Sequence, residues 1–264
     1  MAEERASVAT LVLTLSYDGA PFAGFARQEG HDTVQGRLES ALGTVMRREV
    51  ESTGAGRTDA GVHALAQVVS VPLFAGEEPD LPVLLRSLNA LVGGGIVVTG
   101  AHIARPGFSA RFDAQAREYR YRLVPGPVPP LFLRDVAWWM KHGLDVEAMR
   151  TAAEALVGEH DFRSFCVAES AEGKRTVRRI EAIDITSAEE FGEHCVVVRV
   201  VGNAFLHSMV RVIVGSLVEV GRGRRSPEWL GETLAACDRA AAGPTAPAHG
   251  LVLWHVSYAE ECWL

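Results

Sequence analysis

The 264-residue chain is predicted to be an α+β protein, in which two similar lobes with mainly antiparallel sheets are fused around a central cleft. Stretches of alternating apolar and polar side chains predict strands, and apolar side chains at helical spacing predict helices between them. A similar order of these elements occurs in both halves of the chain, which indicates two related lobes. Hydrophobic residues make up 48% and charged residues 22% of the sequence, a composition that excludes a disordered chain.

The first predicted lobe covers residues 1–108. Residues 10–17 (TLVLTLSY) alternate apolar and polar side chains, as a half-buried strand does, and a turn follows at Asp18-Gly19. A helix is predicted at 33–48, with Thr33 as its N-cap. The remaining elements of this lobe are a strand at 66–74, a short helix at 80–91 and a strand at 96–103.

The second predicted lobe covers residues 109–264 and contains no sequence repeat of the first. A strand at 117–124 leads into the proline-rich loop 125–130. Ser226 is predicted as the N-cap of a later helix that has Pro227 at its first position. The other expected elements are a helix at 145–157, paired strands at 175–186 and 195–202, a helix at 205–220 and a final strand at 251–258.

Residues 54–63 (GAGRTDAGVH) form the segment in which chemistry is most expected. Its three glycines let the backbone turn sharply and let a ligand approach closely. A side chain presented from such a loop faces open space, and this suits a reactive group such as Asp59. The alternative is an Asx-turn, in which the Asp59 carboxylate only binds its own backbone. Taken alone, a G-x-D-x-G pattern favours the turn.

The run GRTDAGVH at 56–63 resembles the catalytic loop of the TruA-type tRNA pseudouridine synthases, which has the pattern G-R-T-D-x-G-V-H. Further segments match the same family in the same order over nearly the whole chain. They are Tyr17-Asp18-Gly19 with Phe22 and Gly24-Phe25, Thr33-Val34-Gln35 with Leu38-Glu39, Phe108-Ser109-Ala110-Arg111, Arg117-Glu118-Tyr119-Arg120-Tyr121, 203–217 (NAFLHSMVRVIVGSL) and 242–251 (AGPTAPAHGL). The resemblance implies the pseudouridine synthase fold, with RNA bound in the central cleft.

The resemblance also implies roles for particular side chains. Asp59 corresponds to the catalytic carboxylate, and the sequence leaves open whether it attacks the base or the sugar or removes a sugar proton. Tyr119 corresponds to the residue that stacks on the target uracil, and Arg211 to the basic residue that pairs with the aspartate. By their own patterns alone, Tyr119 would be a core residue and Arg211 a solvated one.

Three further residues are expected to contact the substrate. Arg57 resembles the arginine that holds the place of the flipped-out nucleotide. His207 and Arg111 lie in the matching segments and are expected to face RNA, and neither is needed as an acid–base catalyst. Two departures from the family pattern, Phe25-Ala26 where Trp-Gln is usual and Ser208 where a second His is frequent, concern RNA binding rather than the chemistry.

The implied reaction converts uridine to pseudouridine in the anticodon stem-loop of tRNA, at nucleotides 38–40 by family resemblance. The bond from C1′ to N1 breaks and C1′ joins C5, so neither a cofactor nor a metal is expected. The family also implies a homodimer. Two alternatives remain: a catalytically silent RNA-binding module, and a glycosylase that releases uracil.

The charge distribution is compatible with an RNA partner, although the net charge is −7. Arginines are concentrated in two stretches, and local clusters of this kind can hold a phosphate backbone along one cleft. The stretches comprise Arg105, Arg111, Arg117, Arg120 and Arg122, and then Arg211, Arg222, Arg224 and Arg225.

The remaining composition indicates a cytoplasmic protein without metal or membrane partner. The cysteines are widely spaced and the histidines lack the spacing of metal ligands, so neither a disulfide framework nor a metal site is expected. No apolar run is long enough to span a bilayer, and the N-terminus lacks the basic and apolar parts of a signal peptide.

Overall fold

The computed structural model describes residues 6–264, which form two compact units. The first unit comprises the chain up to Gln115 together with Leu253–Leu264, and the second comprises Ala116–Val252. Each unit joins helices to a mainly antiparallel sheet, which confirms the predicted α+β class. Among the described residues, every helix is too short or too polar to cross a lipid bilayer.

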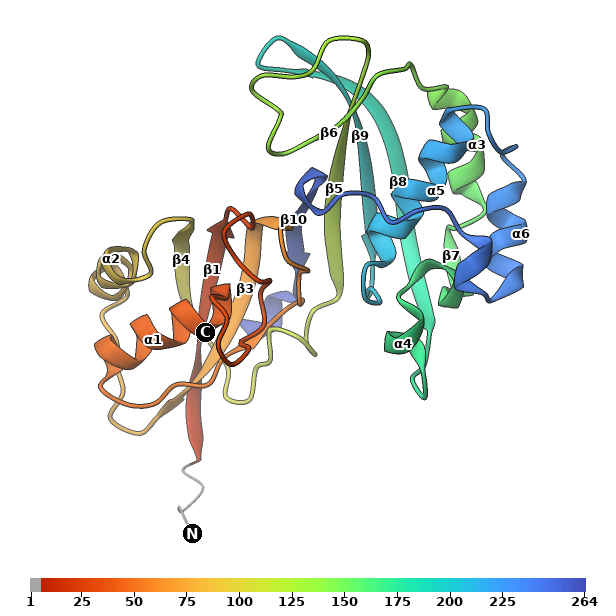
Figure 1. Ribbon diagram of the computed structural model, residues 1–264. Helices are drawn as coiled ribbons and strands as arrows, with labels where there is room; N and C mark the ends of the chain where they lie inside the picture. The colour runs from red at the N-terminus through yellow and green to blue at the C-terminus, as the bar shows by residue number, and fades with distance from the viewer. Residues whose placement is uncertain (1–5) are drawn as a thin grey trace. The chain divides into compact units, whose positions relative to one another are not determined.

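The sheet of the first unit has the order β4, β1, β3, β10. The strands are β1 (Ser7–Tyr17), β3 (His63–Phe74), β4 (Ile96–Ala104) and β10 (Leu251–Ser257), and the short β2 (Thr53–Gly54) pairs with β3. Strand β1 is antiparallel to both of its neighbours, β3 and β4. Helix α1 (Val34–Met46) crosses a face of the sheet, and α2 (Leu81–Leu91) lies beside α1 and β4 (Figure 1).

Capping explains where the helices of this unit begin. The Thr33 side chain accepts a hydrogen bond from the Gly36 amide, and the Asp80 side chain accepts one from Val83, so both helices begin as predicted. The core between helices and sheet contains the alternate β1 residues Leu11, Leu13 and Leu15, all fully buried. Burial alternates only from Leu13 to Tyr17, because Thr10 and Val12 are buried as well, so the predicted half-buried strand is covered on both faces in its middle.

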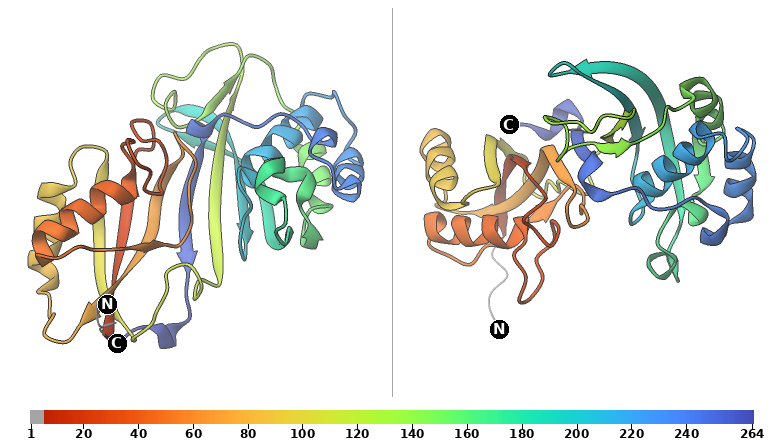
Figure 2. Two further views of the ribbon diagram at one scale, coloured as in Figure 1. Left: turned by 60° about the horizontal axis from the view of Figure 1, so that its bottom comes forward. Right: turned by 45° about the horizontal axis from the view of Figure 1, so that its top comes forward.

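The sheet of the second unit has the order β5, β9, β8, β7, with antiparallel pairing throughout, and β6 lies parallel to β5. The strands are β5 (Ala116–Pro125), β6 (Trp138–Met140), β7 (Gly158–Asp161), β8 (Val177–Glu190) and β9 (Glu193–Gly202). The helices α3 (Val146–Glu154), α5 (Met209–Gly221) and α6 (Trp229–Ala236) lie together, as both views of Figure 2 show, and α3 also contacts β8.

Short helical segments complete the described chain. They are α4 (Ala168–Ala171) and single 3₁₀ turns at Arg163–Phe165, Arg239–Ala241, Ala248–Gly250 and Glu260–Cys262.

Three helices of the second unit differ from the sequence prediction. Helix α5 begins at Met209 rather than at residue 205, because Ser208 has φ = 57°, a left-handed conformation that interrupts the helix. Helix α6 begins at Trp229, and Pro227 belongs to a preceding turn in which the Trp229 amide binds the Ser226 carbonyl. Helix α3 begins after its cap Asp145, as predicted, but ends at Glu154.

Candidate active site

Asp59 lies on the loop between β2 and β3, and backbone hydrogen bonds fix this loop on both sides of it. The Ala55 amide donates to Val68 O at 2.8 Å, and the Phe25 amide donates to Thr58 O at 3.1 Å. A turn closes when the Val62 amide donates to Asp59 O at 3.1 Å, and Gly61 supplies φ = 77°. The turn therefore uses the backbone carbonyl of Asp59, so the carboxylate is not needed to form it.

A buried glutamine holds the start of the loop. Gln67, on β3, is fully buried, and its amide group binds both polar groups of Gly56: Nε2 donates to Gly56 O at 2.8 Å, and Oε1 accepts from Gly56 N at 3.4 Å. Both contacts use one planar side chain, so the backbone three residues before Asp59 has a fixed orientation. The role of Gln67 could not be predicted from the sequence, since a single Gln in a strand carries no motif.

A buried tyrosine holds the loop next to Asp59. The Tyr17 hydroxyl lies 2.8 Å from Thr58 Oγ1. Burial raises the pKa of Tyr17 to about 12, although its hydrogen bonds with Thr58 and Gln67 act in the opposite direction. The phenol therefore remains neutral at physiological pH and keeps a proton to donate.

Two glycines in residues 17–25, the first segment that matches the family, allow this segment and the Asp59 loop to pack closely. A Cβ at Gly19 would lie 2.1 Å from Val62 O, so any side chain there would push the loop away. Gly24 has φ = 105° and faces Thr58 O, where a Cβ would lie at 3.1 Å. The two glycines thus connect the first motif of the sequence physically to the segment around Asp59.

The two candidate residues of the loop are both accessible to solvent, to different degrees. Arg57 is exposed and Asp59 is partly exposed, whereas Thr58 between them is buried. This alternation follows from the anchoring of Thr58 through both its carbonyl and its hydroxyl. A carboxylate and a guanidinium on a rigid loop can meet a ligand without a further change of the backbone.

His63, the last residue of the motif at 56–63, is buried and stabilises the loop through a hydrogen bond. Its Nδ1 accepts a hydrogen bond from the Gly19 amide at 3.1 Å, with Asp18 Oδ1 also 3.1 Å away. Its Nε2 is buried, with no hydrogen-bond partner among the described residues. These contacts make His63 a local hydrogen-bonding group that holds Gly19 next to the loop.

Tyr119 lies on β5 in the second unit, paired with Val200 of β9. Its side chain is largely buried and meets the ring of Phe205 nearly at right angles, with 5.2 Å between ring centroids. Tyr121 follows two residues later and therefore points to the same side of β5. Burial raises the pKa of Tyr121, while the Arg211 guanidinium acts to lower it. The Tyr121 hydroxyl donates to Pro247 O at 2.8 Å.

Arg211 lies in the first turn of α5 and is held by residues 242–251, which are called the C-terminal motif below. Its Nε donates to Ala246 O at 2.8 Å, and the Ala246 amide donates back to Arg211 O at 3.0 Å. The motif approaches α5 closely at Gly215, where a Cβ would lie 1.8 Å from Pro244 O. Arg211 is therefore a half-buried and oriented side chain, unlike the solvated arginine that its helical pattern alone predicts.

The segment before α5 is fastened to two strands. Asn203 binds the backbone of Arg179 on β8 twice, through Oδ1 to the Arg179 amide at 3.0 Å and through its own amide to the Arg179 carbonyl at 3.1 Å. From β5, Arg117 donates to Asn203 O at 2.5 Å. His207 is exposed, and its carbonyl accepts from Val167 N at 3.2 Å.

Arg111 belongs to a separate turn of the first unit. Its guanidinium lies over the ring of Phe112, 5.4 Å from the centroid, and both side chains are exposed. Asp113 stabilises the turn by accepting from the Ser109 amide and from Arg105, each at 2.7 Å.

The sequence was compared with known proteins. A family profile described as tRNA pseudouridine synthase matches residues 152–259. A tRNA pseudouridine synthase A from Brevibacillus brevis is 45% identical over 92% of this chain and 97% of its own length. The chain belongs to the tRNA pseudouridine synthase A family. Proteins of the same name from Frankia casuarinae and Bacillus subtilis are 46% and 42% identical, over 95% and 94% of this chain and 90% and 98% of theirs.

The predicted site residues of this tRNA pseudouridine synthase A family member divide between the two units. Arg57 and Asp59 share one loop of the first unit, and Arg111 occupies a different turn of that unit. Tyr119, on β5, and Arg211, on α5, both belong to the second unit, and His207 lies in the segment that leads into α5. Within residues 6–264, no three His, Cys, Asp or Glu side chains gather in a way that could hold a metal ion.

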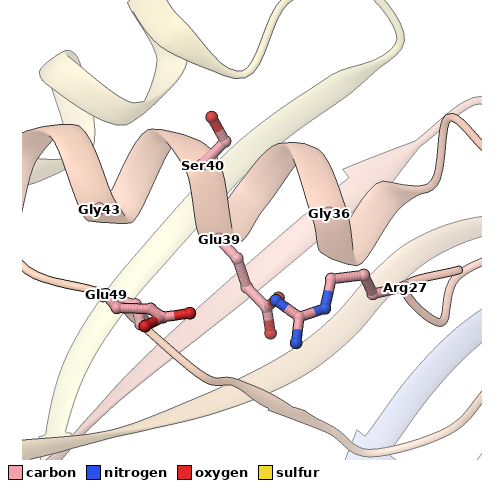
Figure 3. A pocket seen from close by; sticks show the side chains of 7 residues that line it. Arg27, Gly36, Glu39, Ser40, Gly43 and Glu49 are labelled. Carbon is pink, nitrogen blue, oxygen red and sulfur yellow. The ribbon is translucent and has the colours of Figure 1, made fainter. Parts of the chain in front are cut away.

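A pocket of about 250 Å³ lies beside α1, and Figure 3 shows the side chains that line it. Its main charged group is Glu39, a buried carboxylate with Arg27 at 3.3 Å. Glu39 Oε1 accepts hydrogen bonds from Gln35 at 3.1 Å and from the amide and hydroxyl of Ser52, each at 2.9 Å. The Gln35–Glu39 motif of this family member thus fastens α1 to the chain just before β2, at the start of the Asp59 loop.

Proposed function

We propose that the chain isomerises uridine to pseudouridine in tRNA, at nucleotides 38–40 of the anticodon stem-loop, with Asp59 as the catalytic carboxylate. The observation that carries the proposal is the Asp59 loop itself. Gln67 of β3 and the Phe25 amide bind the loop backbone, Tyr17 of β1 binds the Thr58 hydroxyl, and Asp59 remains partly exposed. Membership of the tRNA pseudouridine synthase A family supports the same reaction.

The reaction requires groups that this chain supplies by itself. The bond from C1′ to N1 breaks, the uracil turns, and C1′ joins C5, so that no atom is gained or lost except the C5 proton, which the solvent exchanges for the one on N1. A carboxylate oxygen of Asp59 acts on the base, on C1′ or on the C2′ proton. Deuterium at C2′ distinguishes the third route from the other two, because a primary isotope effect appears only where that proton is removed.

The other site residues are proposed to hold the target nucleotide. A flipped-out base costs a few kcal/mol of lost stacking. Stacking on the Tyr119 ring returns about 1–3 kcal/mol of this cost. Arg211 balances the negative charge of the reacting groups, while Arg57, His207 and Arg111 contact RNA.

The direct test is the release of tritium from C5 of uridine in unmodified tRNA, without added cofactor. We expect the wild-type protein to release tritium, and the Asp59→Asn variant to lose all turnover while it still binds tRNA. Asp135→Asn is the control, since Asp135 is an exposed surface carboxylate paired with Arg134. Turnover by Asp59→Asn would overturn the assignment. Free uracil among the products would indicate a glycosylase, and binding without any conversion by the wild type would indicate a silent RNA-binding module.

We also propose that two chains form a homodimer, and that the enzyme acts in the cytoplasm, where its tRNA substrate is found. The net charge of −7 supports the dimer, because two chains together can present a longer track of arginines to one tRNA than one chain can. Light scattering tests this proposal. A monomeric mass combined with full activity would contradict it.

A further inference from the structure

Phe205 is a half-buried aromatic residue in the segment between β9 and α5, and it was assigned no role from its sequence position. Its ring meets Tyr119 at an interplanar angle of 85°, with 5.2 Å between the centroids. Perpendicular contact at this distance is a favourable arrangement of two aromatic rings. Phe205 therefore lies directly against the side chain that is proposed to stack on the target uracil.

The position of the Phe205 ring is set by its surroundings. Gly202 leaves room for it: a Cβ at Gly202 would lie 3.1 Å from Phe205 Cζ and 2.8 Å from Arg179 O. Asn203, two residues before Phe205, is bound on both sides to the backbone of Arg179 and also accepts from Arg117. The backbone that carries the ring is thus fastened to β5 and β8 together.

We propose that Phe205 is a positioning residue, which holds the plane of the Tyr119 ring in the orientation that stacks on uracil. A tyrosine ring turns about a broad terminal torsion that rotamer preferences restrain only weakly. A second ring perpendicular to it blocks this rotation, because the edge of one ring would enter the other. The inference rests on the proposed function, since it concerns how Tyr119 meets the base.

The same segment connects Tyr119 to Arg211. Phe205 lies six residues before Arg211, and the Leu206 carbonyl accepts from Met209 N at 3.1 Å, where α5 begins. Loss of the Phe205 ring would make the Tyr119 ring more mobile, while every group proposed to react stays in the protein. The expected signature is a slower chemical step with little change in tRNA affinity.

The kinetic test compares Phe205→Leu, which removes the ring, with Phe205→Tyr, which restores one. With enzyme in excess over tRNA, we expect Phe205→Leu to slow the single-turnover rate by roughly tenfold or more, with the tRNA Kd within about threefold of wild type. Phe205→Tyr should return the rate to within about threefold of wild type. Phe162→Leu is the control, because Phe162 is a fully buried ring of the same unit that contacts Phe165. Phe162→Leu should lower Tm but leave the single-turnover rate unchanged at temperatures where the protein is folded.

A spectroscopic test needs no activity. In protein labelled with ¹³C on its tyrosine rings, Phe205→Leu should shift the Tyr119 signals and speed the flipping of that ring, while Phe162→Leu should leave both unchanged. An unchanged rate in Phe205→Leu, or an equal loss of rate in Phe162→Leu, would overturn the positioning role. The proposed function fails separately, if Asp59→Asn turns over tRNA.

Discussion

At the scale of single residues, the conformation of the Asp59 loop depends on buried polar groups that are not proposed to react themselves. Gln67 binds both backbone groups of Gly56, and Tyr17 binds the hydroxyl of Thr58. Buried polar groups are costly when they lose their partners, so such contacts fix a single conformation of the loop. This network fixes the backbone next to Asp59, which remains partly exposed.

Tyr17 should make the protein less stable as the pH rises into the alkaline range. The pKa of Tyr17 is raised to about 12 in the folded state from 10.0. Its contribution is therefore fully present below pH 10 and is lost as the pH rises toward 12, by up to about 3 kcal/mol. Urea unfolding at pH 9 and pH 11 should show this loss in the wild type and a smaller one in Tyr17→Phe. Equal losses in both proteins would contradict the role of burial.

Gln67 should be needed for both stability and turnover. Gln67→Leu leaves the Gly56 amide and carbonyl without their partner, which costs about 1–3 kcal/mol of unfolding free energy, and the loosened loop lowers kcat. Gln28→Leu is the matched control, since Gln28 is exposed and makes one bond to Ala23 O. Denaturation curves and tritium release measure both effects. A Gln67→Leu protein with the stability and kcat of the control would refute this.

At the scale of elements, the sequence predicted best what depends on neighbours in the chain. Thr33 caps its helix as predicted, and helices start next to Asp80 and Asp145 as expected, because capping is a local interaction. The prediction that Ser226 is an N-cap was wrong, since α6 begins after Glu228. The prediction that α5 begins at residue 205 was wrong, because Ser208 adopts a left-handed conformation and Asn203 before it is bound to Arg179 on another strand. Strands β2, β6 and β7 were missed, since two to four residues are too few to show a period.

The candidate site divides in the same way. The motif at 56–63 and the Tyr and Arg motifs identified the family, which the relatives at 45% and 46% identity then showed. The residues that support these motifs were not predicted: Gln67 and Phe205 act through contacts between strands and loops that are distant in sequence. A motif identifies a reactive side chain, whereas the orientation of that side chain depends on tertiary packing.

Gly215 allows the C-terminal motif to pack on α5, and its replacement should release Arg211. In Gly215→Ala the added Cβ would lie 1.8 Å from Pro244 O, so the motif must move and the bond from Arg211 to Ala246 is lost. We expect a loss of about 1–3 kcal/mol in stability and a strong loss of kcat. In Gly231→Ala, on α6, the new Cβ would meet Ala155 at 3.7 Å, an ordinary contact, so stability should stay the same or rise. Similar behaviour of the two variants would contradict this role of Gly215.

At the scale of the whole molecule, an acidic chain must bind a polyanion through local arginines. The net charge of −7 excludes a uniformly positive surface. Each cation that meets a phosphate releases counterions, so the salt dependence of binding counts such contacts. Arginines proposed to contact RNA should differ in this respect from arginines that pair only with neighbouring acids.

Arg111→Ala should weaken tRNA binding and lower the slope of log K against log salt by about one unit. Arg134→Ala serves as the control, because Arg134 is exposed and pairs with Asp135. The measurement is the tRNA Kd over a range of salt concentrations for the three proteins. An unchanged slope for Arg111→Ala would remove Arg111 from the proposed RNA contacts.

The most direct measurement maps pseudouridine in tRNA from cells that lack this protein and from the same cells supplied with either the wild-type gene or the Asp59→Asn gene. We expect pseudouridine at nucleotides 38–40 to be absent in the first cells, present with the wild type and absent with the variant at equal protein level. Pseudouridine restored by Asp59→Asn would show that the carboxylate on this loop does not perform the reaction.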